Sequence, residues 1–229
     1  MVKKPENVFV IIPAYNEGSR LGGVLANLKN EGFTRLIVVD DGSTDNTHEV
    51  ARNAGAVLIS HHINRGPGAA TQTGLEYARL CHAKLAATID ADGQHNPKDL
   101  HTLIEKITQS RLDVVFGSRF LGKGNHIPVL KRIFNRIADL ITFILSTQWV
   151  SDSQTGLKVF SHTALEKIVI NTDGFEFCTE IFMQIRQHKL KYCEVPITVN
   201  YEAGSQAKGQ NLATGISTLF KLFLEAITK

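Results

Sequence analysis

The sequence predicts an α/β fold, with a mostly parallel central sheet and helices on both of its faces. Short apolar runs alternate along the chain with longer segments of helical periodicity, which is typical of strand–helix–strand units. The apolar runs are continuous rather than alternating, as in strands buried on both faces. With 229 residues, the chain is long enough for one large core, and we expect residues 1–229 to form a single domain.

Each element of the first half follows from a local pattern. Five apolar runs, each ending at turn or polar residues, predict strands at 7–12, 35–39, 56–60, 85–89 and 113–117. Helical spacing of apolar residues between these runs predicts four helices. The first is expected to begin with Ser19 as its N-cap, the second lies near 50–54, and the others cover 69–81 and 97–110.

The second half is less regular. Residues 129–145 predict a basic amphipathic helix, with Lys131, Arg132 and Arg136 opposite its apolar side. That apolar side could pack on the core or lie on a membrane, and the sequence leaves both open. Further segments predict a strand at 157–160, helices at 164–170 and 177–188, an edge strand within 193–201 marked by Pro196, a basic loop at 204–209 and an amphipathic helix at 215–229.

Composition excludes several classes of protein. The net charge is only +3, so the totals do not call for a nucleic-acid partner. The 3 cysteines are widely spaced, which excludes a disulfide framework or a zinc site and fits a reducing compartment. The first residues lack the apolar core of a signal peptide, and no window reaches the length of a transmembrane span. We therefore expect a cytoplasmic protein, either soluble or peripheral on the cytoplasmic face of a membrane.

Polar segments follow four of the predicted strands directly, at 13–17, 40–41, 90–94 and 117–119. Ligands of such sheets bind outside the carboxyl ends of the strands. In the third segment, Asp90 and Asp92 leave a buried strand together, which is costly unless a cation lies between them. A hard divalent ion held by carboxylates and substrate phosphates would meet this requirement. The alternative is a solvated turn.

Taken in order, the motifs of the chain resemble those of family 2 glycosyltransferases with the GT-A fold. Within that family they resemble the dolichyl-phosphate mannose synthase-like branch, which transfers sugars to polyprenyl phosphates. The matching motifs extend over about 195 residues: IIPAYNE (11–17), VVDDGSTDNT (38–47), NRGPGAA (64–70), IDADGQHNP (89–97), VVFGSRF (114–120), DSQTGLKVF (152–160) and EVPITVNYEAGS (194–205).

The resemblance implies a metal-dependent, inverting transfer from GDP-mannose or a UDP-sugar to a polyprenyl or dolichyl phosphate. Residues 1–120 would bind the donor and residues 121–229 the acceptor. The implied metal ligands are Asp90, Asp92 and Gln94, whose oxygen atoms favour Mg²⁺ or Mn²⁺ over zinc. The implied nucleotide-sugar contacts are Pro13, Tyr15, Glu17, Val39, Asp41, Asp90, Ala91, Asp92, Arg119 and Lys208.

On the acceptor side, the resemblance implies catalytic roles for Asp92, Arg119 and Asp152, and acceptor contacts for the group Gln154, Thr155 and Ser205. Relatives often carry an arginine between Tyr201 and the Gly-x-Ser sequence, but Glu202 and Ala203 stand there in this chain. Asp152 either acts as a general base or fixes its loop. A polyprenyl phosphate is already ionised and needs positioning, whereas a hydroxyl acceptor needs a base.

Two other functions remain open at this point. The chain could transfer sugar to a saccharide or other hydroxyl acceptor with Asp152 as the base, or it could be a non-catalytic subunit that binds nucleotide-sugars. The two amphipathic helices either pack inside the protein or contact a membrane surface or a membrane-anchored partner subunit. The sequence predicts no nucleic-acid partner.

Overall fold

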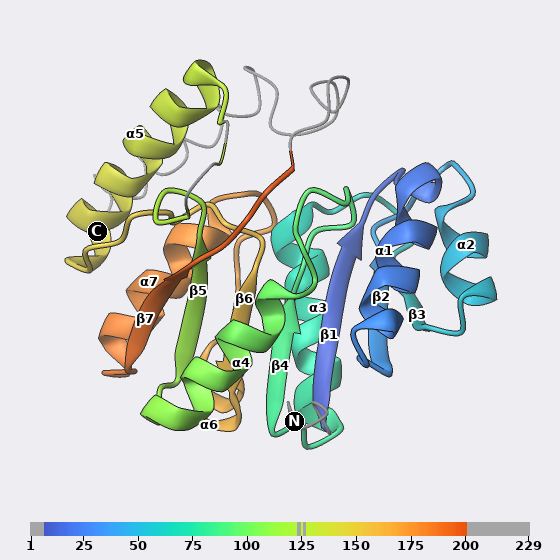
Figure 1. Cartoon of the computed structure of the whole chain (residues 1–229), viewed down its shortest axis with the longest axis horizontal. Helices are drawn as coiled ribbons and strands as arrows, with labels where there is room; N and C mark the ends of the chain where they lie inside the picture. Colours follow the sequence, from blue (N-terminus) through green and yellow to red (C-terminus); the bar gives the residue numbers. More distant parts are fainter. Residues whose placement is uncertain (1–6, 123–124, 126, 201–229) are drawn as a thin grey trace.

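The computed structural model describes residues 7–122, 125 and 127–200, and its centre is a seven-stranded sheet with the strand order β3-β2-β1-β4-β6-β5-β7 (Figure 1). The strands are β1 (Val8–Ala14), β2 (Arg35–Asp40), β3 (Val57–Ser60), β4 (Leu85–Thr88), β5 (Val114–Ser118), β6 (Lys158–Ser161) and β7 (Tyr192–Pro196). All pairs are parallel except those of β6, which lies antiparallel between β4 and β5. The prediction of a mostly parallel sheet is confirmed, and Pro196 does lie on an edge strand, where its missing N–H costs nothing.

Helices cover both faces of the sheet. They are α1 (Gly18–Asn30), α2 (Thr47–Asn53), α3 (Pro67–Leu80), α4 (Asp99–Ser110), α5 (Val129–Ser146), α6 (His162–Lys167) and α7 (Phe177–Gln187). Along β1, Val10 and Ile12 pack in a core with α1 and α4, whereas Phe9 and Ile11 pack in a second core with α3 and α7. This is why the apolar run is continuous: both faces of the strand are buried.

Two predicted helix boundaries were wrong. Ser19 does not cap α1, because the helix begins at Gly18. The backbone N–H of Gly18 donates to Asp45 Oδ2, in the loop between β2 and α2, at 3.1 Å. The helix predicted at 164–170 ends at Lys167, as α6. Beyond it the chain is tied down by a side chain instead, since Ile170 N donates to Gln72 Oε1 at 2.8 Å.

Helix α5 exposes its apolar side and buries a polar one. It lies beyond the carboxyl ends of the strands, next to α7 (Figure 1). The exposed large apolar side chains are Val129, Leu130, Ile133, Ile137, Leu140, Phe143 and Ile144, and the buried polar ones are Asn135, Asp139, Thr142 and Ser146. Thr142 Oγ1 lies 2.8 Å from Thr179 Oγ1 of α7, so hydrogen bonds satisfy part of this interface. None of the helices in the described ranges is long and apolar enough to cross a bilayer. The predicted loop at 204–209 and helix at 215–229 lie outside the described residues.

Candidate active site

A pocket of about 260 Å³ opens at the carboxyl ends of β1, β4 and β5, where the rule for parallel sheets places ligands. The antiparallel β6 contributes its amino-terminal end to the same edge. The pocket brings together ten of the residues predicted from sequence: Pro13, Tyr15, Glu17, Asp90, Ala91, Asp92, Gln94, Arg119, Gln154 and Thr155. Three of the four predicted polar segments, at 13–17, 90–94 and 117–119, therefore meet in this pocket.

Two predicted nucleotide contacts, Val39 and Asp41, are buried away from this pocket. Asp41 Oδ1 accepts the N–H of Arg65 at 3.0 Å, and its Oδ2 accepts that of Gly66 at 2.7 Å. His61 Nδ1 lies 2.6 Å from Asp41 Oδ1. The carboxylate thus holds the loop before α3. Direct contact of Val39 or Asp41 with a nucleotide stays a prediction, and Ser205 and Lys208 lie outside the described residues.

The two aspartates after β4 have opposite electrostatic surroundings. The side chain of Asp90 is 51% exposed toward the pocket, and its Oδ2 lies 3.2 Å from His95 Nε2. Partial loss of water around Asp90 raises its pKa, but the His95 contact and the charges of Lys158 and Arg119 outweigh this effect and hold that pKa below its usual value. Asp92 Oδ1 accepts the N–H of Gln94 at 2.9 Å. Burial and the neighbouring Asp90 carboxylate raise the pKa of Asp92.

These residues fit a divalent metal ion. Two neighbouring carboxylates repel each other, which raises the pKa of one of them. A cation bound between them removes this repulsion and stabilises both charges. The oxygen atoms of Asp90, Asp92 and Gln94 are the ligands that Mg²⁺ and Mn²⁺ prefer. In the part of the chain that the structure describes, no group of three or more His, Cys, Asp or Glu side chains could hold a metal. Where Mg²⁺ is bound by only one or two carboxylates, substrate phosphates and water complete its coordination shell.

Gly156 lies against the Asp90 carboxylate. A Cβ atom at this position would overlap the Asp90 carboxylate, so any larger residue would displace that carboxylate. The carbonyl of Gly156 also accepts a hydrogen bond from Thr88 Oγ1 at 2.7 Å. The position of the first aspartate thus depends on the loop at 151–156 as well as on β4.

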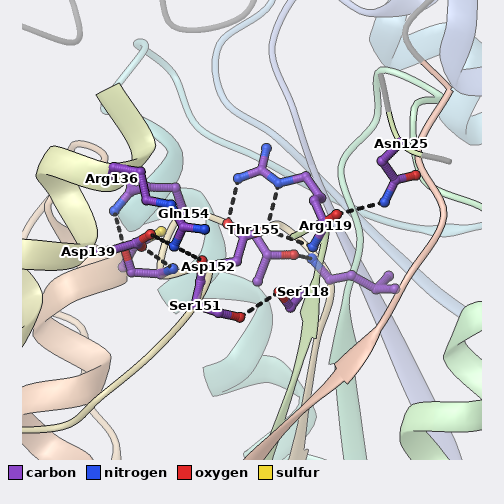
Figure 2. Close-up of polar contacts among 12 residues, drawn as sticks. Ser118, Arg119, Asn125, Arg136, Asp139, Ser151, Asp152, Gln154 and Thr155 are labelled. Carbon is purple, nitrogen blue, oxygen red and sulfur yellow. Dashed lines mark hydrogen bonds and ion pairs between the residues drawn. The ribbon is translucent and has the colours of Figure 1, made fainter. Parts of the chain in front are cut away.

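Arg119 and Asp152 form a two-pronged ion pair (Figure 2). Arg119 Nε donates to Asp152 Oδ2 and Arg119 Nη2 to Asp152 Oδ1, both at 2.7 Å. The backbone N–H of Arg119 donates to the same Oδ2 at 2.9 Å. Asp152 is fully buried and does not line the pocket. Of the two roles expected for Asp152, this geometry favours fixing the site over acting as a base, because both oxygens already accept hydrogen bonds from Arg119.

The pocket also contains residues that were not predicted as site residues: His95, Lys131, Asn135, Lys158 and Phe177. Burial lowers the pKa of Lys131. Asn135 Nδ2 is buried and has no hydrogen-bond partner among the described residues. The Lys158 ammonium donates to the carbonyl of Thr155 and lies 5.1 Å from the centre of the Phe177 ring. Periodicity could identify the polar side of α5, but not that this side faces the site.

Comparison with known proteins identifies similar chains. The family model described as glycosyl transferase family 2 matches residues 9–169. A UDP-N-acetylglucosamine–dolichyl-phosphate N-acetylglucosaminyltransferase of Methanococcus voltae is 34% identical, with 95% of each chain covered. A dolichyl-phosphate beta-glucosyltransferase of Trichomonas vaginalis is 29% identical, over 88% of this chain and 68% of its own.

A solved structure also resembles this fold. The glucosyl-3-phosphoglycerate synthase of Mycobacterium tuberculosis, in complex with Mn²⁺, UDP and glucosyl-3-phosphoglycerate, superposes with a TM-score of 0.76. Its sequence is 17% identical, and the match covers 99% of this chain and 81% of that one. The likeness therefore establishes the fold alone.

Proposed function

Because the chain belongs to glycosyl transferase family 2 and is a glycosyltransferase with the GT-A fold, we propose that it transfers a sugar from a nucleotide-sugar to a polyprenyl phosphate. The relative from Methanococcus voltae is named for a UDP-sugar and dolichyl phosphate, which supports both substrate classes. UDP-sugars are therefore the first donors to test, ahead of GDP-mannose.

The strand order suggests how the donor lies. Pro13 lies near the end of β1 and Tyr15 follows it, the aspartates follow β4, and Lys158 begins β6. These three strands are consecutive in the sheet. A nucleotide-sugar has its parts in the same order: nucleoside, diphosphate, sugar. We place the nucleoside at β1, the diphosphate at Asp90 and Asp92, and the sugar toward β6. A bound Mg²⁺ or Mn²⁺ would neutralise charge on the leaving diphosphate.

The single observation that carries the choice of acceptor is the distribution of charge in the pocket. The acidic side chains in its described lining are Glu17, Asp90 and Asp92, and we assign them to the donor side. The same lining holds the cations Arg119, Lys131 and Lys158, and we assign Arg119 and Lys131 to the acceptor side. A hydroxyl acceptor needs a general base within hydrogen-bond reach, and the described lining offers none there. A phosphate monoester is already ionised at neutral pH, since its second pKa is about 6.

The proposed reaction is a single displacement with inversion. The acceptor phosphate would bind Arg119 and Lys131, with the buried donor of Asn135 beside them. The diphosphate would be held on the opposite side, by the loop after β4. An oxygen of the acceptor phosphate bound at Arg119 and Lys131 would attack the anomeric carbon from the side away from the leaving diphosphate. The protein would therefore contribute mainly positioning and electrostatic stabilisation.

An omission experiment tests this function. The release of UDP from a UDP-sugar is measured with Mn²⁺ and a short prenyl phosphate, and then with each component left out in turn. We expect release only when both are present. The proposal would be rejected if the rate of UDP release did not depend on the lipid phosphate but increased when a saccharide acceptor was added.

Substitution of Gly156 by alanine tests the link between the loop at 151–156 and the metal ligands. The added Cβ displaces the Asp90 carboxylate, and we expect Mn²⁺-dependent turnover to fall roughly 10²-fold, as for a misplacement of about 1 Å. The control is Gly23→Ala on α1, where a Cβ meets nothing within 4 Å. Unchanged turnover in Gly156→Ala would contradict the assigned position of Asp90.

The exposed side of α5 suits a membrane surface. Its apolar residues face outward, and the basic side chains of Arg132 and Arg136 are also exposed on this helix. An apolar strip flanked by cations is typical of helices that lie in the interface of an anionic bilayer. Because Lys131 and Asn135 of the same helix line the pocket, docking through α5 would bring the pocket to the membrane that holds the acceptor.

We expect the double substitution Leu140→Glu and Ile144→Glu to abolish binding to anionic liposomes in a co-sedimentation assay. Each apolar side chain contributes about 1.5 kcal/mol or more when buried, so the loss in partitioning is at least about 10²-fold. Leu80→Glu on α3, another exposed leucine, is the matched control and should leave binding intact. Equal binding by the double variant and the control would rule out this docking side.

A further inference from the structure

The loop at 151–155 is largely buried although it forms neither helix nor strand. Asp152, Ser153 and Thr155 are fully buried. A buried irregular segment must satisfy its backbone N–H groups with side chains, because no regular hydrogen-bond ladder is available. The identity of those side chains determines what holds Asp152, and through it Arg119, in place.

Glu194 of the edge strand β7 supplies most of this support. Its Oε2 accepts the N–H of Ser151 at 2.8 Å, and its Oε1 accepts that of Asp152 at 3.0 Å. The hydroxyl of Ser151 donates to Oε1 at 2.8 Å. One carboxylate therefore binds two consecutive backbone donors and a side chain, and hydrogen bonds to a charged acceptor are the strong ones.

The contacts continue from this loop to the end of β5. Ser151 Oγ lies 2.7 Å from Ser118 Oγ, and the next residue of each segment forms the Arg119–Asp152 ion pair (Figure 2). Ser118, the last residue of β5, and Arg119 thus contact Ser151 and Asp152 of the loop, respectively. Because β7 pairs with β5, Glu194 reaches this junction from the adjacent strand.

We propose that Glu194 is a positioning residue for sugar transfer: through Ser151 and Asp152 it holds the Arg119 guanidinium where the acceptor phosphate binds. The inference rests on the proposed function. Glu194 does not line the pocket, so it acts only through the loop. Loss of its charge should therefore affect use of the acceptor and leave the donor site, on the other side of the pocket, unchanged.

The test is Glu194→Gln, assayed with UDP-sugar, Mn²⁺ and a short prenyl phosphate. An amide accepts through one oxygen only, so part of the backbone support is lost, and we expect the KM for the prenyl phosphate to rise roughly ten-fold or more. The Kd for UDP with Mn²⁺ should stay within about two-fold. A wild-type enzyme that does not use prenyl phosphate at all would reject the proposed function itself, before any variant is compared.

Glu180→Gln is the matched control. Glu180 also clamps a loop, since Oε1 accepts the N–H of Asn171 at 2.9 Å and Oε2 that of Thr172 at 3.0 Å, but it does not touch Arg119. We expect Glu180→Gln to lower Tm without changing the KM for the prenyl phosphate. If Glu194→Gln behaves like this control, or weakens UDP binding as much as acceptor use, the positioning role is wrong.

A double-mutant cycle with Arg119→Lys isolates the coupling. If Glu194 acts through the ion pair between Arg119 and Asp152, the effects of the two substitutions on kcat/KM for the acceptor should be non-additive. Additive effects would contradict the proposal. If Glu194→Gln does not fold, Ser151→Ala carries the test. It removes the hydroxyl contacts with Glu194 and Ser118 and should raise the same KM about three-fold, whereas an unchanged KM would overturn the inference.

Discussion

Substitution of Asp92 by asparagine is expected to lower sugar transfer at least about 10³-fold, because a metal ion on the leaving diphosphate contributes several kcal/mol. Asparagine keeps the shape of the side chain but loses the charge that holds a divalent cation. Turnover with Mn²⁺ and calorimetry of UDP binding in the presence and absence of Mn²⁺ measure the two losses. Metal-dependent turnover that survives in Asp92→Asn would contradict the assignment of this loop.

The same substitution should stabilise the metal-free protein at neutral pH. The pKa of Asp92 is raised in the folded state by burial and by Asp90, so the folded protein binds this proton more tightly than the unfolded chain does. The unfolding free energy therefore falls as pH rises from the pKa of Asp92 in the unfolded chain to its raised pKa in the folded protein. Above that range the charged carboxylate destabilises the folded state. Removing the charge should raise the unfolding free energy. The control, Asp113→Asn, lies outside the pocket and should not gain stability.

Substitution of Asp152 by asparagine separates positioning from base catalysis. Breaking a buried ion pair should lower the unfolding free energy by about 3 kcal/mol. Hydrogen bonds to charged groups contribute about 1.5–3 kcal/mol, so kcat/KM for the prenyl phosphate should fall roughly ten- to hundred-fold. Because Asp152 is fully buried against Arg119, the shape of the pH–rate profile should not change. UDP binding should also be unaffected.

Asp139→Asn is the control for this experiment. Asp139 Oδ1 accepts the N–H of Ser153 at 2.8 Å, so it supports the same loop without touching Arg119. Burial raises the pKa of Asp139 to about 6, and its replacement by a neutral amide should cost little near that pH. If Asp152→Asn removes the acidic limb of the pH–rate profile, or if its effect equals that of Asp139→Asn, the positioning role of Asp152 is wrong.

The sheet and one side of the pocket were predictable from the sequence for a physical reason. Continuous apolar runs such as that of β1 require burial on both faces, and parallel strands deliver the residues that follow them to one edge. Tyr15, Asp90 and Arg119 could therefore be brought together without a structure. The sequence predicted a strand at 157–160 but not that β6 runs antiparallel and begins at this edge, and this is why Lys158 was not identified as a residue of the pocket.

The acceptor side was less predictable because it depends on contacts between distant residues. Spacing does not show that Asp152 pairs with Arg119, 33 positions earlier. The periodicity of α5 defines two sides, but the usual rule that the apolar side faces inward is reversed here, since Thr142 and Asn135 are buried and Ile137 and Leu140 are exposed. Asp41 follows β2 as expected, yet nearby backbone N–H groups bind its carboxylate.

The most direct test of the account compares two acceptors with the same prenyl chain, one ending in a phosphate group and the other in a hydroxyl group. A prenyl phosphate and the prenyl alcohol of the same chain length are offered to the enzyme with a UDP-sugar and Mn²⁺, and the glycosylated products are identified by mass spectrometry. The account predicts transfer to the phosphate and none to the alcohol, because Arg119 and Lys131 bind an anion and the described pocket lining holds no base on that side. Comparable transfer to the alcohol would contradict it.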